Sequence, residues 1–112
     1  MTDKELLELA AKAAGVKDIW AYDEEHNCLI LDSFYGRKIW NPLTDDGDAL
    51  RLAVKLGIKD YFGIEIQKTC VQATSFEPWE HCEYEEYKTQ GPHAATRRAI
   101  VRAAAEGGKG ME

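Results

Sequence analysis

The stretch Trp40 to Gly57, WNPLTDDGDALRLAVKLG, decides much of the fold because a turn, an acidic cluster and a helix follow one another in it without a gap. Pro42 lacks a backbone donor and biases the residue before it away from helix, so it stops any extended element there. Thr44 or Asp45 is the expected N-cap, and the aspartates that follow would face the positive end of the helix dipole. We therefore predict a helix that begins in this acidic cluster and ends at Gly57.

The same aspartates have the chemistry of calcium ligands, but their spacing does not fit a calcium loop. A loop that began at Asp45 would need a glycine at its sixth position and a glutamate at its twelfth. In this chain the glycine arrives at Gly47, and the twelfth residue is Leu56. The pattern favours helix capping, and we predict neither a metal nor a cofactor.

The helix that follows is apolar around most of its circumference. Its polar stripe consists of three residues, Asp48, Arg51 and Lys55. Since nearly all other positions are Ala, Val or Leu, we expect this helix to be packed on most of its surface.

The composition is that of one globular domain. The chain has 112 residues, 45% hydrophobic and 30% charged, with a net charge of −6. This length builds a core without disulfides, and three cysteines without a CxxC spacing indicate reduced thiols. No apolar run is long enough for a membrane span, and the acidic start does not resemble a secretory signal. We expect a cytoplasmic protein that does not bind membranes.

Periodicity and turn residues predict the remaining elements. The first helix starts at the capping box of Thr2 and Glu5 and ends at Gly15. The last helix starts at Pro92 and ends near Gly107, and its many alanines permit close approach to a sheet. Strands are expected at 19–22 and 28–31 as a hairpin, at 64–67 and 71–74 as two strands or one long one, and at 81–88, with 33–40 as a surface crossing or a short strand.

These elements, among which no internal repeat is visible, predict an α+β fold. One antiparallel sheet of about four to five strands would have three helices packed around it, as in an α/β/α sandwich. The single domain spans residues 1–106, and residues 107–112 are expected to form a flexible tail.

Histidine and cysteine offer ligands of the right type for zinc, but in an unusual order. His81, Cys82 and Glu83 resemble the start of a zinc deaminase signature, yet no cysteine follows to complete it. A zinc site built from His26, Cys28, His81 and Cys82 would need two hairpins to converge, and its spacings match no usual pattern. Ordinary thiols are the favoured interpretation.

Arg97, Arg98 and Arg102 form the main basic cluster, which we interpret as a solvated helix face. The helix-strand-strand-strand-helix order after Thr44 is shared with double-stranded RNA-binding domains, but those need a basic helix start. Because the net charge repels phosphate, we do not expect nucleic acid as a partner.

The most unusual surface is an acidic and aromatic segment near the end of the sheet. Its candidate partner-binding residues are Trp79, Glu80, Glu83, Tyr84, Glu85 and Tyr87. Aromatic side chains among carboxylates suit a basic protein partner, whereas the alternative is a solvated edge strand whose tyrosines pack inward.

The turn and helix of WNPLTDDGDALRLAVKL, together with ATRRAIVRAA at 95–104, resemble the phage ABA sandwich domain family of small phage and prophage proteins. The resemblance runs over about residues 6–105 and implies an antiparallel sheet with helices around it, and a phage origin. The matching positions are structural, namely Trp40, Asn41, Pro42, Asp48 and Ala49. Because the family has no assigned activity, it carries over no catalytic residue.

A phage origin favours a non-enzymatic accessory protein. We expect a small acidic binding module or inhibitor that acts in the host cell on a host protein with a basic surface. The alternatives are a small metal- or thiol-dependent enzyme and a virion structural protein, and self-association into a homo-oligomer is compatible with the binding role.

Overall fold

The computed structural model describes residues 1–33, 36–59, 62–75 and 81–109. Within these ranges the α+β class is confirmed, with three helices and six strands. In chain order the elements are α1 (Asp3–Ala14), β1 (Ile19–Asp23), β2 (Cys28–Ser33), β3 (Gly36–Trp40), α2 (Asp46–Lys59), β4 (Phe62–Ile66), β5 (Cys70–Ser75), β6 (His81–Glu86) and α3 (Pro92–Lys109). No helix in these ranges has both the length and the apolar character needed to cross a membrane.

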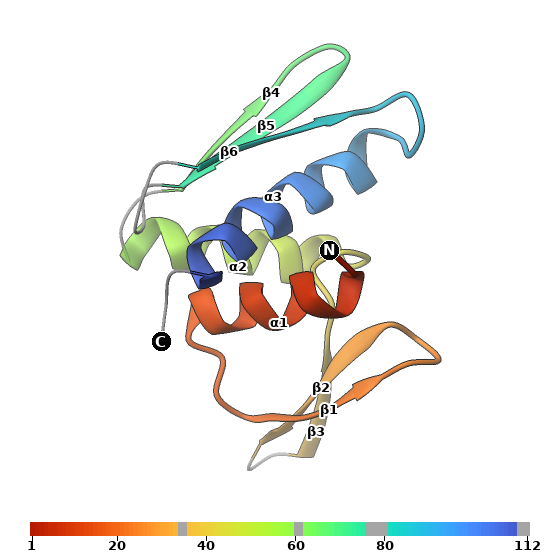
Figure 1. The fold of residues 1–112 in the computed structure, drawn as a ribbon, viewed down its shortest axis with the longest axis vertical. Coiled ribbons are helices and arrows are strands. Elements are labelled where there is room, and N and C mark those ends of the chain that lie inside the picture. The colour runs from red at the N-terminus through yellow and green to blue at the C-terminus, as the bar shows by residue number, and fades with distance from the viewer. Residues whose placement is uncertain (34–35, 60–61, 76–80, 110–112) are drawn as a thin grey trace.

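The strands form two antiparallel sheets, one of β1, β2 and β3 and one of β4, β5 and β6. The helices lie between the sheets, so that each sheet covers one side of a helical layer (Figure 1). This differs from the predicted single sheet of four to five strands with helices outside it. The reason is that each short meander pairs only with its own neighbours, while α3 buries one face against a sheet and another against α1.

The predicted hairpin at 19–31 is present, and β3 extends it into a meander. Leu29 lies between Tyr22 on β1 and Trp40 on β3, and both Leu29 and Trp40 are buried in the main core. The turn is built by Asp23, whose carboxylate accepts the backbone amides of Glu25 and His26. Through Leu29 and Trp40, one face of this sheet packs on the helices.

Helix α1 begins and ends where its caps predict. The Thr2 hydroxyl oxygen accepts the backbone amide of Glu5, and the Glu5 carboxylate in turn accepts the hydroxyl proton of Thr2. At the other end, Gly15 adopts the left-handed conformation with φ 73° and returns its amide to the last turn. Both caps could be predicted from the sequence because capping involves only neighbouring residues.

Helix α3 packs against α1 through small residues, and Gly108 marks the closest approach. A Cβ atom at Gly108 would lie 2.1 Å from the carbonyl oxygen of Leu9, so only glycine fits. The helix therefore continues to Lys109 with Gly108 buried, past the predicted boundary at residue 106. The glycine pair does not end the helix because packing against α1 holds it in place. Residues 110–112 lie outside the described residues.

The opposite face of α3 packs on the second sheet. Val71 and Ala73 of β5 are fully buried against an alanine stripe on the helix, formed by Ala95, Ala99 and Ala103. The prediction that alanine permits close approach to a sheet is thus confirmed.

The topology also repeats, although the sequence shows no repeat. In each half a three-stranded meander is followed by a helix, β1-β2-β3-α2 and then β4-β5-β6-α3. The middle strands begin alike, Cys28 before Leu29 and Cys70 before Val71, and all four side chains are buried. The two halves are therefore alike in topology and in this pair of buried positions.

Candidate functional site

The acidic cluster at the start of α2 is a structural clamp. Asp48 is 5% exposed, and its carboxylate accepts the backbone amide of Asn41 at 2.9 Å and the Arg51 guanidinium at 2.7 Å. Asn41 is also buried, and its side chain donates to the carbonyl of Asn27 and accepts the amide of Leu43. Asp48, predicted as part of the polar stripe of α2, is therefore buried and ties the turn after β3 to α2.

The other two aspartates of the cluster contact the start of α2 and helix α3, respectively. Asp45, one of the two predicted N-caps, accepts the backbone amide of Asp48 at 2.8 Å. Asp46 forms an ion pair of 2.6 Å with Arg97 on α3. The helix then runs past Gly57 to Lys59, so Gly57 does not end it as predicted. Within the described residues, no group of three or more His, Cys, Asp or Glu side chains could hold a metal ion.

Helix α2 is not packed on most of its surface, contrary to expectation. Ala49, Leu52 and Ala53 are buried, whereas Leu50, Val54 and Ile58 are 62%, 51% and 82% exposed. These three residues are spaced four apart and so form one apolar stripe along the helix. We call Leu50, Val54 and Ile58 the α2 stripe. It is exposed because α1 and α3 cover only the other side of the helix.

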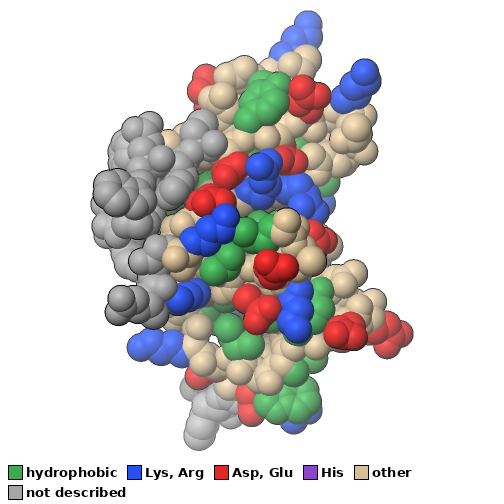
Figure 2. Space-filling view, in the orientation of Figure 1, with side chains coloured by type: hydrophobic (Ala, Val, Ile, Leu, Met, Phe, Trp, Pro, Cys, Tyr) green, Lys and Arg blue, Asp and Glu red, His purple; other side chains and the backbone are tan. Residues whose placement is uncertain are grey.

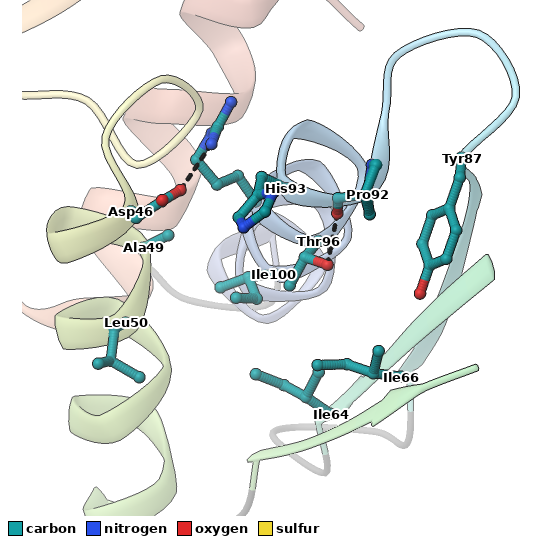
Figure 3. Close-up of a pocket in the computed structure, with 11 residues that line it drawn as sticks. Asp46, Ala49, Leu50, Ile64, Ile66, Tyr87, Pro92, His93, Thr96 and Ile100 are labelled. Atoms are coloured by element: carbon teal, nitrogen blue, oxygen red, sulfur yellow. Dashed lines mark hydrogen bonds and ion pairs between the residues drawn. The ribbon is translucent and has the colours of Figure 1, made fainter. Parts of the chain in front are cut away.

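Leu50, the first residue of the α2 stripe, lines an apolar groove between α2 and strand β4. The groove has a volume of about 490 Å³. In Figure 3, Leu50 on one wall faces Ile64 and Ile66 on the other, and Ile100 and Thr96 of α3 lie between the walls. Ile64 and Ile66 are 38% and 70% exposed. They project from the α3-facing side of the sheet, because they pair with the buried residues Ala73 and Val71.

The groove forms because α3 covers the second sheet unevenly. The helix lies over β5, and Arg102 reaches from it to the acidic side chains of Glu83 and Glu85 on β6. On β4, Phe62 packs against the helices, whereas Ile64 and Ile66 stay 38% and 70% exposed. The apolar face of this edge strand is therefore left facing α2.

Polar contacts fix the rim of the groove. Arg97 donates to the Leu43 carbonyl at 2.8 Å as well as to Asp46, and so holds α3 against the start of α2. The Tyr87 hydroxyl donates to the Gln67 carbonyl at 2.7 Å. Because these polar groups already have partners, the groove offers mainly apolar contact and suits apolar side chains of another molecule.

The predicted acidic and aromatic segment is divided between different environments. Trp79 and Glu80 lie outside the described residues. Glu83 and Glu85 are largely covered and paired with Arg102, whereas Tyr84 is 47% exposed on the opposite face of the sheet. Tyr87, on the loop after β6, lines the groove. Of the predicted residues that the structure describes, Glu83 and Glu85 thus lie on one face of β6 and Tyr84 on the other.

The four candidate zinc ligands belong to two distant parts of the fold. His26 and Cys28 lie at the β1–β2 turn, whereas residues 81 and 82 begin β6 in the other sheet, across the helical layer (Figure 1). The His26 ring contacts Asp23 at 2.8 Å, and this hydrogen bond lowers the pKa of Asp23. Burial raises the pKa of the Cys28 thiol, which disfavours a reactive thiolate.

The arginines of α3 form ion pairs and are not the unpaired basic face that was predicted. Arg98 contacts Asp3 of α1 at 3.1 Å, Arg97 contacts Asp46, and Arg102 bridges to β6. Acidic and basic side chains are accordingly interspersed over the face that carries α1 and α3 (Figure 2). These arginines hold the layers together, and a free basic patch for phosphate is not formed by them.

Sequence reasoning missed the groove residues, although a signal was present. The apolar circumference of α2 exceeds what two other helices and a small sheet can cover, so part of it had to face solvent or a partner.

Comparison of the chain with protein-family models, curated proteins and solved structures finds no match.

Proposed function

We propose that this protein is a non-enzymatic binding protein whose groove between α2 and β4 holds part of another polypeptide chain. The observation that carries the proposal is that Leu50 faces the exposed Ile64 and Ile66 across an apolar groove, while Val54 and Ile58 continue the exposed α2 stripe along the helix. Large aliphatic side chains gathered on one concave surface mark interaction sites, whereas scattered ones do not.

The energy available in the groove suits protein association. Covering a fully exposed Leu, Ile or Val side chain contributes about 1.5–3 kcal/mol. The three residues of the α2 stripe together with Ile64 and Ile66 are 38–82% exposed, so covering the groove and the stripe could contribute on the order of 5–8 kcal/mol. Association itself costs about 4–15 kcal/mol, so further contacts around the groove are needed for tight binding.

The proposal also covers the origin of this protein and the kind of partner that it binds. The resemblance of Trp40–Ala49 and of 95–104 to the phage ABA sandwich domain family supports a phage origin and action inside the host cell. The net charge of −6 supports a host protein with a basic surface. Tyr84 and Glu86, exposed on the outer face of the second sheet, are where such a surface would contact this protein.

Site-specific photocrosslinking tests the binding role for a partner of any identity. A photoreactive amino acid would replace Leu50 or Ile66 in the groove, and Ile39 on the first sheet would serve as a matched control, since Ile39 is 62% exposed. After irradiation in the producing cells, mass spectrometry identifies the crosslinked peptides. We expect polypeptide crosslinks from Leu50 and Ile66 well above those from Ile39.

Two results would contradict the proposal. One is an absence of polypeptide crosslinks from both groove positions under conditions in which the protein is folded. The other is equal crosslinking from the groove and from Ile39, which would indicate non-specific contact.

A further inference from the structure

The two sheets have four edge strands, and those of the first sheet are protected against pairing with another chain. Strand β1 is irregular between Ile19 and Ala21, and such a bulge disrupts regular pairing. Strand β3 carries Arg37 and Lys38 in succession, and charged side chains on an edge oppose association. Both edges therefore carry features that discourage strand addition.

The second sheet has one protected edge and one open edge. Strand β6 carries Glu83, Glu85 and Glu86, and Arg102 lies over two of them. Strand β4, in contrast, reads Phe-Gly-Ile-Glu-Ile, with Glu65 as its single charge. In the described residues β4 pairs only with β5, so its other edge presents free backbone groups beside the groove.

We infer that β4 pairs antiparallel with β4 of a second copy of this chain, forming a two-fold symmetric dimer with a continuous six-stranded sheet. The inference rests on the proposed function, because it names the chain that fills the groove. A two-fold axis makes the same surface serve both copies, as is usual in homodimers.

One register pairs all five residues of β4 and also keeps the two glutamates apart. With the axis at Ile64, this residue lies opposite Ile64 of the second copy, and Phe62 lies opposite Ile66. Glu65 then lies opposite Gly63, so that no two like charges are opposed. An axis at Glu65 would instead place the two glutamates against each other, which is unfavourable.

The same register covers the exposed apolar side chains. Ile66, the more exposed of the β4 isoleucines, would contact Phe62 of the second copy on the groove side of the sheet. Leu50 of each copy lines the groove and would face the added strand. A basic partner would then bind to the joined outer faces, on which each copy presents Tyr84 and Glu86.

Sedimentation equilibrium on the purified full chain is the first test. We expect a mass twice the 12.6 kDa of one chain at micromolar concentration. Because each copy carries −6, salt should strengthen this dimer by screening, whereas it should weaken binding of a basic partner. Ile66→Lys should weaken dimerisation about tenfold or more, and the matched variant Ile39→Lys should leave it unchanged.

Disulfide trapping tests the register. Ile64→Cys should give a covalent dimer under mild oxidation, because directly opposed residues are close enough for a disulfide. Wild-type protein controls for the native cysteines, and Ile39→Cys controls for random collision. Circular dichroism would verify that each variant is folded.

The outcomes separate this inference from the proposed function. A monomer at all concentrations, or a dimer that Ile66→Lys leaves intact, overturns the inference. If a monomeric protein still gives groove crosslinks to a foreign polypeptide, the binding function stands and the second copy is not its occupant. Absence of both dimer and crosslinks overturns the two together.

Discussion

Substitution of Gly108 by alanine tests the helical layer most directly. The added Cβ would lie 2.1 Å from the carbonyl oxygen of Leu9 and 2.8 Å from its carbonyl carbon. Both atoms belong to the backbone of α1 and cannot rotate away. The helices would have to separate by about 1 Å or more to restore van der Waals distance.

Two opposing effects set the expected change in the free energy of unfolding of Gly108→Ala. Overpacking of a core costs about 1–3 kcal/mol, and contact with backbone places Gly108→Ala near the upper end. Replacing a helical glycine by alanine contributes about 1 kcal/mol in the favourable direction. We therefore expect a net loss of about 2 kcal/mol in the free energy of unfolding, a large share of the roughly 5–15 kcal/mol of a typical domain.

Urea unfolding followed by circular dichroism measures this loss of stability. We expect a lower urea concentration at the transition midpoint, with an unchanged slope of the free energy of unfolding against urea concentration. Gly57→Ala is the matched control, because a Cβ there would meet its nearest neighbours in Phe62 at 3.9 Å and 4.0 Å. That variant should gain up to about 1 kcal/mol from helix propensity alone. If Gly108→Ala were as stable as wild type, the described packing of α1 on α3 would be wrong.

Three further predictions concern the clamp, the hairpin and the thiols. Asp48→Ala should lower the free energy of unfolding by about 1–3 kcal/mol in urea titrations, because the buried amide of Asn41 loses its acceptor; an unchanged midpoint would contradict the clamp. His26→Gln should raise the pKa of Asp23, followed by NMR, towards its ordinary value. Since the folded pKa of Asp23 lies below the unfolded one, its stabilising contribution is present above the unfolded pKa and is lost as the pH falls through the folded pKa; an unshifted titration would argue against the His26 contact. Cys28 should resist alkylation in native protein at neutral pH and react after unfolding, as measured by mass spectrometry; rapid native labelling would contradict its burial.

Local signals were sufficient for most elements and for their ends. The Thr2 cap, Gly15, the hairpin and the start of α2 were predicted because each depends on residues within one or two turns of one another. Helix ends at Gly57 and Gly107 were placed too early, since a glycine only weakens a helix and tertiary contacts can carry it further.

The candidate site could not be predicted in the same way. Glu83 and Glu85 were interpreted as part of a free acidic surface, but Arg102 neutralises them from a helix that is distant in sequence. Leu50 was assigned to the core because its pattern does not reveal whether a neighbour is present. The role of the acidic and aromatic segment as a partner-binding surface stays a prediction.

The class of fold, the caps and strands, and the acidic character of this protein follow from composition and from contacts between near neighbours, so they can be predicted from the amino-acid order alone. The division into two sheets, the helices between them and the groove beside β4 result from tertiary packing. These features depend on which of several similar apolar faces meet. That choice is made by packing between distant segments, such as Gly108 against Leu9 and Val71 against Ala99, whose closeness no local pattern encodes.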